Sequence, residues 1–132
     1  MKARLLLVVA AVAITASCFP YPYVERPGTF GTVIDAETGA PIADATVTLN
    51  MHWRDGSVYH STSTTTDTKG RFEFAPHYVW GPFVVTQELS PPVLGTLEAK
   101  SATYSNVARE ISVHAEGHTP VAVGDIRLTK LK

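Results

Sequence analysis

The sequence predicts an all-β protein, a sandwich of about seven antiparallel strands joined by Greek-key connections. Three observations predict it. Short runs rich in Val, Thr and Phe carry apolar residues at every second position, which is the period of a strand with one buried face. Turn-forming Gly, Asp and Pro residues separate these runs, and no helical period is visible after residue 18. A sandwich needs two inner faces to build one core, and about 100 residues are enough for it.

The first 17 residues differ in composition from the rest of the chain. Residues 1–4 carry two basic side chains, and the thirteen residues from 5 to 17 are uncharged and mostly apolar. This order is typical of a secretory signal. A membrane-spanning helix is the alternative, but a run of this length reaches only about 20 Å, short of the ~30 Å hydrocarbon core. We therefore predict a signal peptide over residues 1–17.

Cys18 is the only cysteine, so it has no partner for an internal disulfide. The segment Thr15-Ala-Ser-Cys18 resembles a bacterial lipobox, which implies that Cys18 is lipidated and becomes the first residue of the mature protein. Two acyl chains anchor a protein stably, whereas one binds only marginally. Ordinary cleavage after Ala13 or Ala16 is the alternative. Phe19, rather than an acidic retention signal, follows the cysteine, so in a Gram-negative source we expect an outer-membrane lipoprotein facing the periplasm.

The charge of the mature chain argues against a nucleic-acid partner. Without Lys2 and Arg4, nine basic side chains face twelve acidic ones. Nucleic acids and anionic membrane surfaces both require clustered Lys and Arg, and no such cluster is present in the sequence. We expect the membrane to be contacted through the lipid alone.

The mature chain begins with a segment unlike a strand. Residues 18–28 contain three prolines and no apolar period, so we predict a Pro-rich tether there and a single β-sandwich domain over residues 29–132. Phe30–Ile34 is predicted to be the first strand, and Asp35–Gly39 the turn that ends it.

The next two strands differ in polarity. Ala43–Leu49 alternates strictly, whereas Val58–Thr66, after a turn at Asp55-Gly56, is rich in Thr, Val and Tyr and polar enough to be an edge strand or a loose loop. The residues of the first run that should face the core are Ala45, Val47 and Leu49.

Asp67-Thr-Lys-Gly70 is the clearest hairpin signal in the chain. It lies between Thr62–Thr66 and Arg71–Phe74, and we predict that these two runs pair across it. Phe72 and Phe74 share one face of the second run and should be buried.

The last part of the chain contains further predicted strands. Phe83–Thr86 is one, Arg109–Ala115 is another, Gly117 turns the chain, and Asp125–Leu131 closes the domain. Residues 88–106 have the weakest pattern and are predicted to be a long connection with one edge strand at most. The inward positions of these strands are Ile111, Val113, Ala115, Ile126 and Leu128.

Several of these segments resemble a known family. Gly31-Thr-Val-Ile-Asp35, Thr38-Gly-Ala-Pro-Ile42 and Ala45-Thr-Val47 resemble the opening of carboxypeptidase regulatory-like domains. Thr66–Phe74 is similar to the family's central hairpin, and Val113–His118 to a late turn. The resemblance covers roughly residues 29–131 and departs between residues 75 and 106. It implies a transthyretin-like sandwich without catalysis, in which the matched residues belong to the scaffold.

An enzyme or metal protein is the alternative reading. The chain holds five histidines, at His52, His60, His77, His114 and His118. The last two are four apart, which on a strand spans about 13 Å, too far to share one ion unless Gly117 folds the segment back. Hydroxyisourate hydrolases end in Tyr-Arg-Gly-Ser, a motif that is absent, and no spacing groups the two Tyr and two His of intradiol dioxygenases. We expect no catalytic residue, metal or cofactor.

The remaining candidate is a binding patch. Residues 76–83 hold Tyr78, Trp80 and Phe83, and paired aromatics of this kind stack on sugar rings or contact partner proteins. Trp53 is a weaker case of the same kind. The alternative is that these rings fill the core or cap the sandwich. The sequence therefore predicts a non-enzymatic envelope lipoprotein whose sandwich either binds an envelope protein or a glycan or gives structural support.

Overall fold

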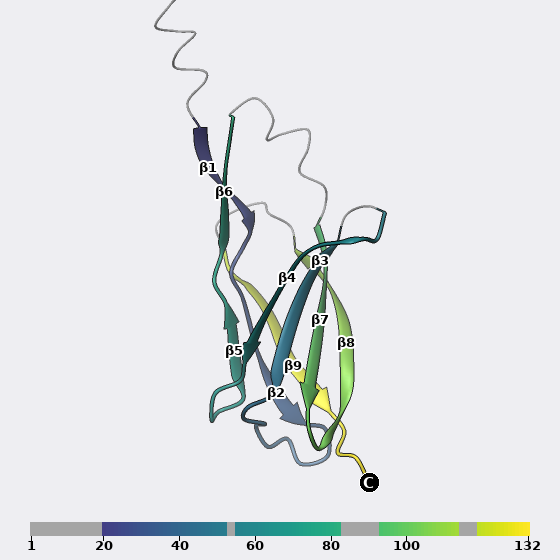
Figure 1. The fold of residues 1–132 in the computed structure, drawn as a ribbon. Helices are drawn as coiled ribbons and strands as arrows, with labels where there is room; N and C mark the ends of the chain where they lie inside the picture. Colours follow the sequence, from purple (N-terminus) through teal and green to yellow (C-terminus); the bar gives the residue numbers. More distant parts are fainter. Residues whose placement is uncertain (1–19, 53–54, 83–92, 114–118) are drawn as a thin grey trace, which may run out of the picture.

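The computed structural model describes residues 20–52, 55–82, 93–113 and 119–132 (Figure 1). These residues form strands, turns and bends but no helix. Accordingly, the described part of the chain contains no helix long and apolar enough to cross a membrane. The strands are β1 (Pro20–Arg26), β2 (Thr29–Asp35), β3 (Thr46–His52), β4 (Val58–Thr65), β5 (Arg71–Phe74), β6 (His77–Pro82), β7 (Val93–Ser101), β8 (Tyr104–Val113) and β9 (Val121–Leu128).

Seven of these strands build the predicted sandwich. One sheet has the order β5-β2-β9 and the other the order β4-β3-β7-β8, while β1 and β6 form a separate two-stranded ribbon. The two sheets lie face to face, and the ribbon extends from one end of the sandwich (Figure 1). The all-β sandwich is therefore confirmed, and β4 is an edge strand as predicted.

One pairing departs from the antiparallel prediction. The central strand β2 pairs antiparallel with β5 but parallel with β9. Parallel neighbours need a long connection between them, and here the strands β3 to β8 all lie between β2 and β9 in the sequence. Alternation within a strand does not reveal this direction, because both kinds of pairing have the same side-chain period.

The core lies between the two sheets and follows the predicted alternation. In β3 the inward positions are completely buried, while the alternate positions remain at least partly accessible to solvent. Phe72 and Phe74 are each 4% exposed, and their rings meet edge to face with centroids 5.9 Å apart. The predicted core residues that are found buried are Ala45, Val47, Leu49, Phe72, Phe74, Ile111, Ile126 and Leu128.

The turn at residues 67–70 forms, but the predicted hairpin is wrong. The N–H of Gly70 donates to the carbonyl of Asp67, yet β4 pairs with β3 and β5 pairs with β2, in different sheets. The N–H of Thr66 donates to the carbonyl of Ala45, and the N–H of Val33 donates to that of Gly70. The two ends of the turn are therefore held by opposite sheets, and the turn carries the chain across the core.

The segment 88–106, predicted to be a connection with at most an edge strand, contains the interior strand β7. This strand pairs with β3 on one side and with β8 on the other. Its buried positions are Gly95, Leu97 and Ala99, while Thr96 and Glu98 alternate with them at half-buried positions. The period of two is present, but glycine and alanine conceal it because they contribute little apolar surface.

The predicted tether region also contains a strand, because residues 20–26 form β1 and pair with β6. At the end of β1, Arg26 is buried, and its Nη2 donates to the carbonyl of Ala75 at 2.7 Å. Its guanidinium lies over the ring of Phe74, 5.8 Å from the centroid. These contacts attach the ribbon to the sandwich core.

The predicted turn at Asp35–Gly39 is confirmed and is connected to the far sheet. The Asp35 carboxylate accepts hydrogen bonds from the N–H groups of Glu37 and Thr38, and the hydroxyl of Tyr104 on β8 donates to it at 3.1 Å. The backbone bonds from Thr38 and then Glu37 are the main causes that lower the pKa of Asp35, while the bond to Asp35 raises the pKa of Tyr104.

Several predictions concern residues outside the described ranges. They are the signal peptide at 1–17, the lipidation site Cys18, the strand at Phe83–Thr86, the turn at Gly117, Trp53 and Ala115.

Candidate binding surface

The outer face of the sheet β5-β2-β9 carries an exposed aromatic side chain at its centre. Alternation along β2 buries Thr29, Val33 and Asp35 and directs Phe30 to the opposite side. The Phe30 side chain is 45% exposed, although β2 is the middle strand of its sheet. The Phe30 ring is therefore accessible at the centre of the outer face of this sheet.

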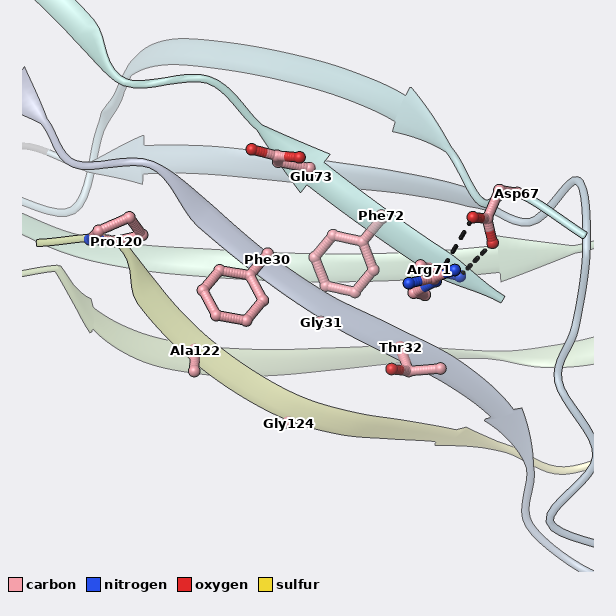
Figure 2. Close-up of a pocket in the computed structure, with 10 residues that line it drawn as sticks. All are labelled: Phe30, Gly31, Thr32, Asp67, Arg71, Phe72, Glu73, Pro120, Ala122 and Gly124. Carbon is pink, nitrogen blue, oxygen red and sulfur yellow. Dashed lines mark hydrogen bonds and ion pairs between the residues drawn. The ribbon is translucent and has the colours of Figure 1, made fainter. Parts of the chain in front are cut away.

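A hollow of about 680 Å³ lies on this face around Phe30 (Figure 2). All three strands of the sheet contribute to it, together with the turn before β5 and the residue before β9. Its lining residues are Phe30, Gly31, Thr32, Asp67, Arg71, Phe72, Glu73, Pro120, Ala122 and Gly124.

A β-bulge in β9 shapes one side of the hollow. Phe30 pairs with Ala122, but the next residue, Gly31, pairs with Gly124, so Val123 is an extra residue in β9. Gly124 has φ 77°, which glycine adopts without strain, and no heavy atom lies within 4 Å of where a Cβ would be. Val123 is 8% exposed and belongs to the core. The bulge therefore places small residues beside Phe30 and leaves space next to its ring.

Charged side chains border the other side of the hollow. Asp67 Oδ1 accepts from the N–H groups of Lys69 and Arg71, each at 2.8 Å, and Asp67 Oδ2 lies 3.6 Å from Arg71 Nε. The backbone bond from Arg71 is the largest cause that lowers the pKa of the Asp67 carboxyl. Glu73 pairs with Phe30, and Arg71 pairs with Thr32, across the same ladder. Glu73 thus lies opposite Phe30 on the neighbouring strand, and Arg71 lies two residues before Glu73 in β5.

The chemistry of this surface favours binding. Its ten lining residues include neither His nor Cys. Asp67 is held in its charged form, so it is poorly suited to act as a general acid near neutral pH. The lining offers an aromatic ring, two carboxylates and a guanidinium, which together can contact an apolar face and hydrogen-bond to polar groups around it.

The structure describes only part of the predicted aromatic patch. Tyr78 lies on β6 in the ribbon and is 52% exposed. Trp80 is placed in the same strand, where its backbone pairs with Pro22 of β1. Phe83 and the predicted lipidation site Cys18 lie outside the described residues.

The predicted histidine candidates do not form a metal site within the described residues. His60 and His77 stack with ring centroids 5.1 Å apart and planes inclined by 19°. Ring nitrogens bind metals along directions in the ring plane, so two stacked rings do not point at one ion. His52 bonds to the carbonyl of Gly56 and to the hydroxyl of Thr96. No three His, Cys, Asp or Glu side chains gather among the described residues, and His114 and His118 lie outside them.

Sequence reasoning did not identify Phe30 as a surface residue. The signal was nevertheless present, because Phe30 and Thr32 lie three residues and one residue before Val33, and in a strand an odd spacing places side chains on opposite faces. If Val33 faces the core, Phe30 must face away from it. The hollow itself was not predictable, since it depends on the register between β2 and β9 and on the bulge there.

A family model described as "Domain of unknown function (DUF6795)" matches residues 31–120. No curated protein matches the sequence. Among solved structures, 3-chlorocatechol 1,2-dioxygenase from Rhodococcus opacus 1CP is 16% identical, with a TM-score of 0.55 over 79% of this chain and 59% of that chain. Chlorocatechol 1,2-dioxygenase from Pseudomonas putida is 14% identical, with a TM-score of 0.51 over 84% of this chain and 61% of that one.

Transthyretin from Sparus aurata is 15% identical, with a TM-score of 0.50 over 77% of this chain and 90% of that chain. At such low identities the likeness is one of fold, and it confirms a transthyretin-like β-sandwich. The chain spans about three fifths of the length of the two dioxygenases, so their activity is not transferred to it.

Proposed function

We propose that this chain, which belongs to the family described as "Domain of unknown function (DUF6795)", is a non-enzymatic lipoprotein of the cell envelope whose sandwich binds a partner. The observation that carries the proposal is the hollow around Phe30 on the outer face of β5-β2-β9. The sandwich is the scaffold, the hollow is the binding surface, and the partner is an envelope protein or a glycan.

The membrane attachment in this proposal rests on sequence. The apolar segment 5–17 directs export, and lipidated Cys18 anchors the mature chain, in a Gram-negative source to the outer membrane with the domain in the periplasm. The motifs Gly31–Asp35 and Thr38–Ile42 support a domain of the carboxypeptidase regulatory-like type. A domain of this type supports or recognises other molecules and carries out no reaction itself.

Photo-crosslinking in cells of the source organism tests the binding surface. A photo-reactive amino acid is introduced at position 30, and the matched control carries it at position 63, where Ser63 is exposed on β4 in the other sheet. We expect a discrete crosslinked product from position 30 that position 63 does not give. Identical products from both positions, or none from position 30, would contradict the proposal.

The predicted aromatic patch of Tyr78, Trp80 and Phe83 is a second contact in this proposal. The exposure of Tyr78 supports it. Replacing a central aromatic of a binding patch typically costs about 2 kcal/mol or more of binding free energy. We expect Trp80→Ala to reduce the amount of crosslinked product while the circular dichroism spectrum stays unchanged. If Trp80→Ala unfolds the domain instead, these aromatics serve the fold and the patch is not a contact.

A further inference from the structure

We propose that the ligand of the hollow is a saccharide, one ring of which stacks on the exposed face of Phe30 while Arg71, Asp67 and Glu73 bind its hydroxyl groups. This inference rests on the proposed function and names the class of ligand that this surface recognises. Three properties of the described residues support it. The backbone of β2 is hydrogen-bonded on both sides, the ring of Phe30 is accessible, and the hollow is lined by side chains of both charges.

The backbone of β2 argues against an extended peptide as the ligand. Peptides commonly bind sheets by adding a strand to a free edge, which requires unpaired N–H and C=O groups. Thr29, Phe30 and Thr32 have partners on both β5 and β9, so β2 itself offers no free edge, and the edge strands of this sheet are β5 and β9. A ligand that lies over Phe30, at the centre of the sheet, therefore contacts side chains on the sheet face.

The surroundings of Phe30 leave room for a flat ring. Its neighbours across the ladder to β9 are Ala122 and, after the bulge, Gly124. Neither has a side chain large enough to cover the phenylalanine ring, and Gly124 faces open space. The hollow of about 680 Å³ lies within the range of about 300–1,000 Å³ that is usual for small-ligand sites.

The charged groups that line the hollow are of both signs. The guanidinium of Arg71 donates hydrogen bonds, whereas the carboxylates of Asp67 and Glu73 accept them. The side chains of Arg71 and Asp67 are 60% and 51% exposed, so a ligand can reach them. A sugar hydroxyl both donates and accepts, so a saccharide can use this mixture. A phosphate or another anion would be attracted to Arg71 but repelled by the two carboxylates.

Nuclear magnetic resonance titration of the mature chain tests the inference, with Cys18→Ala introduced so that the protein stays soluble. The probes are maltotriose, chitotriose and muropeptides from digested peptidoglycan. At least one of them should give saturable shifts of the amide signals of Phe30, Thr32, Arg71 and Glu73. We expect weak binding, with a Kd on the order of 1 mM, because a single ring in an open hollow forms few contacts.

Two variants and one control decide the role of the ring. Phe30→Ala should weaken binding at least tenfold, whereas Phe30→Trp, which keeps an aromatic face, should preserve it. Val58→Ala removes an exposed apolar side chain from the other sheet and should leave the Kd unchanged. No saturable binding of any of the three probes, or equal affinity in Phe30→Ala, would overturn the inference.

Crosslinking and titration together separate the two proposals. A protein crosslinked from position 30, with no saccharide binding in the titration, would refute the saccharide inference and leave the proposed binding function in place. Failure of both experiments would remove the binding function of this surface altogether.

Discussion

Replacing Phe74 by Ala should remove a large part of the stability of this domain. The Phe74 side chain is 4% exposed, meets Phe72 edge to face and lies beneath the guanidinium of Arg26. A buried phenylalanine removes about 150–250 Å² from water, which at about 25 cal/mol per Å² gives an upper limit of roughly 4–6 kcal/mol. Phe→Ala substitutions in protein cores typically cost about 3–5 kcal/mol. We therefore expect a loss of about 4 kcal/mol, compared with a usual total of about 5–15 kcal/mol.

Phe30→Ala is the matched control, because it makes the same chemical change on the same sheet. Phe30 is 45% exposed and borders an open hollow, so its removal loses about half as much buried area and leaves no enclosed cavity. We expect it to cost about 2 kcal/mol or less. Urea unfolding, followed by circular dichroism, measures both free energies of unfolding. If Phe74→Ala cost no more than Phe30→Ala, the assignment of the inner and outer faces of this sheet would be refuted.

Three further predictions concern the turn between the sheets, the pH dependence and the anchor. Gly70→Ala should lower the melting temperature strongly, because Gly70 has φ 69° and an added Cβ would lie 2.5 Å from the carbonyl oxygen of Val33; an unchanged melting temperature would contradict this geometry. The pKa of Asp35 is lowered in the folded protein by the bonds from Thr38 and Glu37, so its contribution to stability should be present above about pH 4 and lost as the pH falls below it. Urea unfolding of Asp35→Asn should therefore show a weaker dependence on pH in this acidic range than the wild type, and an equal dependence would argue against the prediction. Cys18→Ala should release the protein from the membrane fraction, whereas an intact mass showing an unmodified Cys18 in the wild type would remove the basis for the anchor.

Much of the sandwich was predictable because alternation reports directly which face of a strand is buried. Val47 and Leu49 in β3, and Ile126 and Leu128 near the end of the chain, are all buried as expected. These strands contain large apolar residues at inward positions, so their period is visible without knowledge of their partners. The period identifies faces, but it carries no information about which strand lies beside which.

The predictions that failed depended on partners or on weak patterns. The Asp67–Gly70 turn has the chemistry of a hairpin, yet its flanking strands β4 and β5 pair with β3 and β2, in different sheets. The prolines of β1 suggested a tether, but β1 is a strand that pairs with β6. Proline has no N–H, so it fits a strand where the N–H would point away from the partner, and residues two apart, such as Pro20 and Pro22, can both occupy such positions. In β7, Gly95 and Ala99 concealed the alternation.

The candidate surface also depends on strand partners that the sequence pattern does not identify. The outward position of Phe30 follows from alternation, whereas the space beside its ring depends on the bulge at Gly124 in β9. These two residues are more than 90 positions apart in the sequence. The small residues beside the ring and the charged residues Asp67 and Arg71 come together only when three strands are aligned in register.

The parallel pairing of β2 with β9 has a consequence for when this protein can fold. The first strand of the sandwich, β2, has as one of its two sheet neighbours the last strand, β9, which begins about 90 residues later. Closing such a long loop is entropically costly, so pairings of this kind form slowly. During synthesis β9 also emerges last, and until then one side of β2 lacks its partner. A domain with this strand order cannot complete its three-stranded sheet until β9 has been synthesised.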